Sequence, residues 1–138
     1  MNPIGCQSNV APIRRLLLKH PRDAHKNQPT INAQWQTLHY PRATQFEAAM
    51  DEYEAFLALL RRFEMELQFL PEDEKTSLDA IYTHDPVLMT ERGAILCNMG
   101  KREREPEPEA IGRFLQTLGI PILGRIEGIG RLEGGDLI

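Results

Sequence analysis

The chain has 138 residues, of which 41% are hydrophobic, enough for a packed core and too many for a wholly disordered protein. Its net charge is −4, with 16 basic and 20 acidic residues mixed along the chain, which excludes the basic stripe of a nucleic-acid-binding protein. Two cysteines, short apolar runs and no signal-peptide pattern at the N-terminus predict a cytoplasmic protein that does not enter a membrane.

The first half of the chain predicts a strand, a helix and a second strand. Residues 1–12 are expected to form a tail, and the apolar run of residues 13–19 a buried strand that Pro21 ends. Residues 23–31 are polar and predict a loop. Apolar residues at steps of three and four predict a helix over residues 44–66, capped by Thr44. Residues 66–70 predict the next strand.

The second half predicts several strands around one helix. Residues 80–83 and 87–90 are strand-like, and residues 94–97 complete a hairpin with the second of these. A helix is expected to begin near Pro106 or Pro108 and to end at Gly119. Residues 120–123 predict a further strand, and residues 136–138 the beginning of another. The order of elements predicts the α/β class.

Two acids flank the strand predicted at residues 80–83. Alternation along a strand would place Asp79 and Asp85 on one face, where a pair of carboxylates suits the planar guanidinium group. The alternative is that Asp79 caps the strand and that Asp85 forms the turn before Pro86.

A second group of acids closes the chain. Two glycines between Glu133 and Asp136 predict a tight turn with positive φ that a ligand can approach, and Glu133 would then be placed to orient a histidine. The alternative is a hairpin turn with acidic flanks. In the charged loop of residues 100–105, the arginines would either grip a substrate carboxylate or form a solvated surface.

The remaining reactive side chains give weaker signals. Cys97 lies in an apolar strand and is expected to be a buried packing residue, while Cys6 lies in the predicted tail without a neighbouring base. The four histidines lack the spacing of metal ligands, so no metal site is predicted.

Several segments together resemble the guanidino-group-modifying (pentein) superfamily, which contains dimethylargininases, arginine deiminases and amidinotransferases. Residues 78–88 are similar to its substrate-binding strand, and residues 132–136 to its acidic glycine turn. The other similar segments are residues 16–18, residues 69–71, residues 93–96, Gly100-Lys101, and Arg104 with Glu107. The resemblance covers the chain from about residue 13 to its end, and its specificity comes from four motifs in the right order.

The resemblance implies a fold, a chemistry and residue roles. The fold would be a five-bladed α/β propeller, of which residues 13–138 would form roughly the first two blades of one catalytic domain that continues past the chain. A cysteine thiolate would attack the guanidinium carbon, and a histidine would move protons. Asp79 and Asp85 match the acids that bind the guanidinium, Arg104 the arginine that grips the substrate carboxylate, and Glu133 the catalytic carboxylate beside the histidine.

Departures from the family pattern bear on the substrate and on activity. His84 stands where dimethylargininases often carry an acid, and the loop pattern leaves open whether Arg102 takes the place of Arg104. No histidine or cysteine of the chain matches the catalytic pair, so we expect residues 1–138 to show no turnover by themselves.

The sequence therefore predicts part of a hydrolase that acts on the guanidino group of arginine or a methylated arginine, without a cofactor. The expected partner is a small guanidino molecule. An amidinotransferase, or a non-catalytic binding module if the chain is complete, remains an alternative, and the sequence leaves open whether the protein forms a homo-oligomer.

Overall fold

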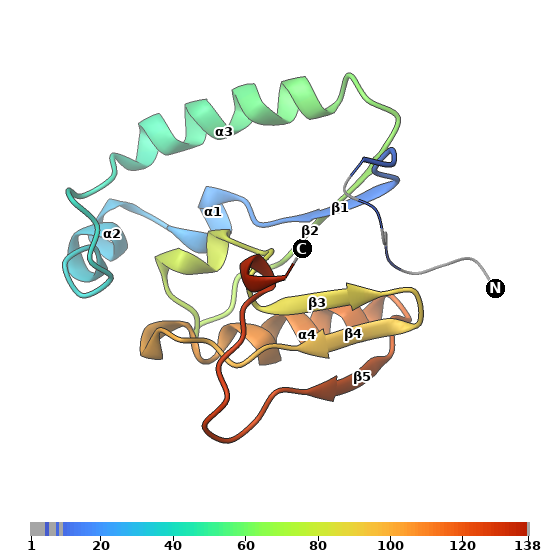
Figure 1. Cartoon of the computed structure of the whole chain (residues 1–138). Helices are drawn as coiled ribbons and strands as arrows, with labels where there is room; N and C mark the ends of the chain where they lie inside the picture. The colour runs from blue at the N-terminus through green and yellow to red at the C-terminus, as the bar shows by residue number, and fades with distance from the viewer. Residues whose placement is uncertain (1–4, 6–7, 9, 138) are drawn as a thin grey trace. The chain divides into compact units, whose positions relative to one another are not determined.

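The computed structural model describes Gly5, Ser8 and residues 10–137. The chain divides into two compact units, one formed by Arg14–Ile81 and the other by Met1–Ile13 together with Tyr82–Ile138. Each unit contains strands and helices, so the predicted α/β class is confirmed (Figure 1).

The unit Arg14–Ile81 is built on two parallel strands. Strand β1 (Arg15–Leu18) pairs with β2 (Glu66–Phe69) in a register that runs from Arg15 opposite Glu66 to Leu18 opposite Phe69. Both strands were predicted, the first of them from its apolar run. Parallel strands need a long crossover, and three helices provide it, with the long helix α3 (Phe46–Leu60) labelled in Figure 1.

The loop predicted for residues 23–31 is wrong, because two short helices occupy this region. Helix α1 (Pro21–Ala24) begins with a proline at its first position, and the His20 ring nitrogen Nδ1 accepts a hydrogen bond from the Arg22 amide at 3.1 Å. Helix α2 (Gln28–Gln34) is capped by Asn27, whose side-chain oxygen accepts from the Thr30 amide at 2.9 Å.

Helix α3 is shorter than predicted, and Thr44 does not cap it. The Phe46 amide instead donates to Gln28 Oε1 at 2.8 Å, while Gln28 Nε2 donates to the Thr44 carbonyl at 3.0 Å. A side chain from α2 thus supplies the cap. Only Leu57 of this helix is buried. The core of the unit lies elsewhere, where Ile31, Leu38 and Leu78 pack together.

The unit containing Tyr82–Ile138 is a three-stranded sheet with a helix packed on it. Strand β3 (Val87–Thr90) forms the predicted hairpin with β4 (Gly93–Leu96), which also pairs in parallel with β5 (Ile122–Arg125). Helix α4 (Glu107–Thr117) contacts all three strands and buries Ile111 and Leu115. It is followed by Gly119 with φ +74°, the conformation that the predicted helix end requires.

Two predicted strand segments are 3-10 helices instead. The first is Leu78–Ile81, where residues 80–83 were expected to be extended. The second is Gly134–Asp136, where Asp136 was expected to begin a strand, and Ile138 lies outside the described residues. Both corrections concern residues that carry acids of the predicted site, so the geometry of that site differs from the expectation.

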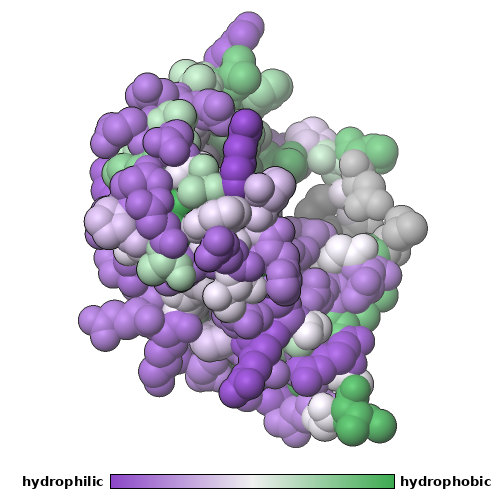
Figure 2. Space-filling view, turned by 90° about the vertical axis from the view of Figure 1, so that its left-hand side faces the viewer, coloured by the Kyte–Doolittle hydropathy of each residue, from purple (hydrophilic) through white to green (hydrophobic). Residues whose placement is uncertain are grey.

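One face of the molecule is mostly polar. Figure 2 shows a largely hydrophilic face on which the hydrophobic residues form small separate groups. None of the helices in the described part of the chain has both the length and the apolar character that a bilayer crossing requires.

Candidate functional site

Asp85 and Arg104 form the centre of the candidate site. Asp85 lies just before β3, and Arg104 lies in the 3-10 helix Arg102–Arg104 that precedes α4. Arg104 Nη1 donates to Asp85 Oδ2 at 2.7 Å, and the Asp85 side chain is 27% exposed. The structure therefore brings together two of the residues that the sequence singled out, and Asp85 keeps an edge toward solvent.

Glu107 is the second carboxylate on Arg104, and sequence reasoning gave it no role. It is buried at the start of α4 and accepts from Arg104 Nε at 2.9 Å and from Nη2 at 2.7 Å. Burial of Arg104 disfavours its charge, but the hydrogen bonds from Glu107 and Asp85 outweigh burial and raise the pKa of Arg104 above its ordinary value. The arginine therefore stays charged between two acids.

Arg104 is almost fully engaged by the protein itself. Its Nη2 also donates to the Tyr82 carbonyl at 3.2 Å, and only Nη1 retains an N–H beyond the bonds to these three residues. The bidentate grip on a substrate carboxylate implied by the resemblance would need the guanidinium to release an internal partner. A single hydrogen bond from Nη1 to a substrate carboxylate would leave all of these internal partners in place.

Glu133 begins the acidic turn and is held by backbone amides. Its Oε1 accepts from the Gly100 amide at 2.8 Å, and the Glu133 amide donates to Asp136 Oδ2 at 2.9 Å in a reciprocal capping arrangement. This turn is attached to the centre of the site, because the Gly134 amide donates to the Asp85 carbonyl at 2.8 Å. Asp85 and Glu133 are thus placed by one set of hydrogen bonds.

The two glycines of this turn do not have the predicted positive φ. Gly134 is needed for a different reason, since a Cβ there would clash with the carbonyl oxygen of His84 and lie 3.0 Å from its carbonyl carbon. The close approach is therefore made by the protein's own backbone. A Cβ on Gly135 would meet Asp85 Oδ1 at an ordinary 3.7 Å.

Asn98 and Arg131 hold the segment that leads into this turn, and the sequence gave no signal for either. Asn98 pairs with Leu132 as an isolated antiparallel bridge. Arg131 Nη1 donates to Asn98 Oδ1 and to the Met99 carbonyl, both at 2.8 Å. These contacts fix Glu133 on the strand edge that follows β4.

Asp79 lies in the other unit, in the 3-10 helix Leu78–Ile81, so the alternation argument that paired it with Asp85 fails. It is only 4% exposed, and the Tyr40 hydroxyl donates to its Oδ1 at 2.8 Å. Burial lowers the pKa of the nearby His25, while the charge of Asp79 opposes that shift. His25 Nδ1 is buried and has no hydrogen-bond partner among the residues that the structure describes.

Cys97 is a buried packing residue, as predicted. Burial, together with the negative charges of Glu133, Asp136 and Asp85, raises the pKa of its thiol to about 11, so it is protonated at neutral pH and a poor nucleophile. The negative charges of Glu133, Asp136 and Asp85 also make this end of the unit favourable for a cation.

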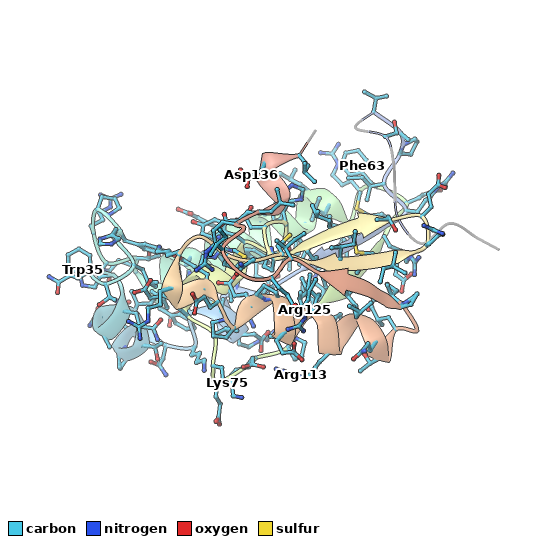
Figure 3. The ribbon with its side chains drawn as sticks, turned by 60° about the horizontal axis from the view of Figure 1, so that its bottom comes forward. Trp35, Phe63, Lys75, Arg113, Arg125 and Asp136 are labelled. Atoms are coloured by element: carbon cyan, nitrogen blue, oxygen red, sulfur yellow. The ribbon has the colours of Figure 1, made fainter. Side chains whose placement is uncertain are left out.

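Two other residues noted in the sequence lie in different surroundings. His84 is exposed beside these acids, and Cys6 lies outside the described residues. Figure 3 labels Asp136 on its turn.

Comparison with known proteins gives one consistent result. A family model described as N,N dimethylarginine dimethylhydrolase, eukaryotic, matches residues 21–133. The chain is 31% identical over 93 residues to N(G),N(G)-dimethylarginine dimethylaminohydrolase of Pseudomonas aeruginosa, an overlap that covers 67% of this chain and 36% of that protein.

Solved structures agree with this match. The structure of a mutant of the Pseudomonas aeruginosa enzyme complexed with citrulline has a TM-score of 0.70 and 25% identity, and the alignment covers 91% of this chain and 46% of that one. A dimethylarginine dimethylaminohydrolase adduct with S-methyl-L-thiocitrulline has the same coverage, a TM-score of 0.69 and 24% identity, which supports the fold. This chain thus spans less than half the length of these relatives. The resemblance found in the sequence is confirmed, and the chain belongs to the dimethylarginine dimethylhydrolase family.

Proposed function

We propose that this chain is the N-terminal part of a hydrolase that acts on the guanidino group of arginine or a methylated arginine. Family membership supports this proposal, and the observation that carries it is the attachment of Glu133 to Asp85 through the 2.8 Å bond from the Gly134 amide. One carboxylate would bind the guanidinium and the other would orient the histidine that moves protons.

Each predicted site residue keeps its proposed role, with one restriction. Asp85 and Asp79 each keep the proposed role of guanidinium binding, and Glu133 is the carboxylate partner of the catalytic histidine. Arg104 contacts the substrate carboxylate through Nη1, since its other nitrogens are bound to Glu107 and to the Tyr82 carbonyl. A small guanidino molecule is the proposed substrate, and residues 13–138 would form roughly two of five propeller blades.

The nucleophile would come from outside residues 1–138. Cys97 is unsuited because its thiol has a pKa of about 11. In the proposed reaction, a cysteine thiolate forms a bond to the guanidinium carbon, the amine leaves with a proton from the histidine, and water then replaces the thiolate to give a ureido product.

The test is product formation by the full reading frame that contains this chain. We would incubate it with arginine, methylarginines and agmatine and detect ureido product and free amine by mass spectrometry. Asp85→Asn and Glu133→Gln are expected to lower kcat/KM by about 10²-fold or more, because each removes a charge that meets the reacting group. Glu109→Gln is the matched control, since Glu109 is exposed and pairs with Arg125 on the surface.

Other outcomes would overturn the proposal. Transfer of the amidino group to an added amine, without ureido product, would identify an amidinotransferase. A reading frame that stops after Ile138, with no turnover but with calorimetric binding of arginine, would identify a binding module. A flat result over the whole panel would refute guanidino chemistry.

A further inference from the structure

Glu107 is a buried acid that the proposed reaction does not use. Its side chain is 3% exposed at the first residue of α4, and Arg104 is three residues earlier in the chain. A carboxylate is costly to bury unless charge and hydrogen bonds compensate it, and Arg104 provides both through Nε and Nη2. The contact joins one edge of the guanidinium to helix α4.

This edge-on contact determines where the other edge of Arg104 lies. A guanidinium is planar and rigid, so fixing Nε and Nη2 on Glu107 also fixes the direction of Nη1. Nη1 then meets Asp85 Oδ2 at 2.7 Å. The Tyr82 carbonyl, at 3.2 Å from Nη2, limits rotation about the remaining axis. The position of Asp85 is thus linked through Arg104 to the start of α4.

Asp85 uses one oxygen for this link and keeps the other. Oδ2 accepts from Arg104, whereas Oδ1 accepts no hydrogen bond from any described residue and faces the exposed Gly135. A carboxylate held by one oxygen presents the second in a fixed direction. That oxygen is the atom available to a guanidinium ligand.

We propose that Glu107 is a positioning residue, which aligns Arg104 so that Asp85 Oδ1 points toward the substrate guanidinium. The proposal rests on the proposed function for the role of Asp85. It differs from that function in giving α4 a part in guanidinium binding, and it predicts that an acid that touches no substrate controls substrate affinity.

The experiment compares Glu107→Gln with Glu109→Gln in the full reading frame. Both acids lie on α4 and pair with an arginine, but Glu109 is 53% exposed, and Figure 3 shows its partner Arg125 apart from the turn that carries Asp136. Glu107→Gln is expected to raise KM by about tenfold to a hundredfold with a smaller change in kcat, because misplacing a contact group by about 1 Å has effects of that size. Glu109→Gln should leave both constants unchanged.

A purely structural role gives a different result. Partial unfolding lowers the active fraction, so the apparent kcat would fall while KM stayed at the wild-type value, and this would overturn the proposal. Agmatine, which lacks the carboxylate, separates the two ends of the substrate. The KM of agmatine should rise with that of methylarginine, whose KM should rise at least as much because Arg104 also contacts the substrate carboxylate. A rise confined to methylarginine would show that Glu107 serves only the substrate carboxylate and would overturn the proposal.

A double-mutant comparison and a second Glu107 variant complete the test of the positioning role. In an Asp85→Asn background, Glu107→Gln should add nothing further to KM, and an additive effect would contradict the proposed route. If Glu107→Gln fails to fold, Glu107→Asp retains the charge at a shorter reach and enters the same comparison. If the wild type turns over none of the substrates, the proposed function fails by itself. Calorimetry with L-arginine then tests Glu107 alone, and unchanged affinity in Glu107→Gln would overturn its role.

Discussion

The two units hold the acids of the predicted site by different means. Asp85 is paired with a charged guanidinium that a second, buried carboxylate fixes in turn. Asp79 is more deeply buried and accepts a hydrogen bond from the neutral hydroxyl of Tyr40, near a histidine whose pKa is lowered. The same residue type, predicted for the same role, therefore accepts from a charged guanidinium in one unit and from a tyrosine hydroxyl in the other.

This difference determines how each region should respond to change. A network of buried charges is stable only when complete, because removal of one partner leaves an uncompensated ion. Removal of a single hydrogen bond from a neutral hydroxyl, such as that from Tyr40 to Asp79, costs less. Substitutions around Asp85 should therefore cost more than equivalent substitutions around Asp79.

The largest effect is expected from Arg104→Met. It removes the guanidinium paired with Glu107, whose side chain is only 3% exposed, and should lower the free energy of unfolding by about 3–5 kcal/mol. Urea denaturation followed by circular dichroism measures this change. Arg125→Met removes an exposed ion pair and should cost less than about 1 kcal/mol. Equal effects of the two substitutions would contradict the contrast between buried and surface charges.

Gly134→Ala should have the next largest effect. The new methyl group meets the backbone of His84, which cannot rotate away, so the acidic turn must shift at a cost of about 1–3 kcal/mol. The matched variant Gly135→Ala has its nearest contact at 3.7 Å and should be close to neutral. Thermal unfolding of both variants tests whether the turn is fixed against Asp85, and a neutral Gly134→Ala would show that it is not.

Tyr40→Phe tests the other region. It removes the donor to Asp79 Oδ1 and leaves a buried acceptor less satisfied, at a cost of about 1–2 kcal/mol in the free energy of unfolding. Tyr82→Phe, on an exposed ring, is the control. A loss of stability as large as that of Arg104→Met would mean that the hydrogen bond from Tyr40 matters as much as the ion pairs of Arg104.

The smallest effect is expected from pH. The pKa of His25 is lowered in the folded state, so below its ordinary value of 6.5 the unfolded chain binds a proton that the folded chain does not. Stability should therefore fall as the pH drops from 6.5 toward the lowered pKa. His25→Leu should reduce this slope in urea titrations between pH 7.5 and 5. His39→Asn, at an exposed histidine with φ 63°, should leave it unchanged.

Sequence patterns were most successful where one local signal decides the structure. The hairpin of β3 and β4, helix α4 and its end at Gly119 all follow from apolar spacing and turn residues. Sequence patterns gave the wrong structure for Leu78–Ile81, a short apolar stretch that fits a strand or a helix equally well. There the Leu78 amide bonds to the side chain of Gln34, a partner 44 residues away that no local pattern reveals.

The candidate site shows the same limit. Asp85, Arg104 and Glu133 were recognised by motif, and the contact between Asp85 and Arg104 agrees with their grouping. Glu107 was noted beside Arg104 as part of the resemblance but was given no role, and its burial against the guanidinium is what distinguishes it physically from the exposed Glu109. Burial is a property of the folded chain, so the sequence alone could not show that Glu107 holds Arg104 from inside the protein.

The hydrogen bonds of the acidic turn also make three backbone amides suitable probes of the site in hydrogen-exchange measurements. The amides of Gly100, Glu133 and Gly134 donate to Glu133 Oε1, Asp136 Oδ2 and the Asp85 carbonyl, respectively. Deuterium would replace these three amide protons only when the turn opens, and at rates set by how often it does so. Their exchange would therefore measure, without any substrate, how long the two acids of the site remain together.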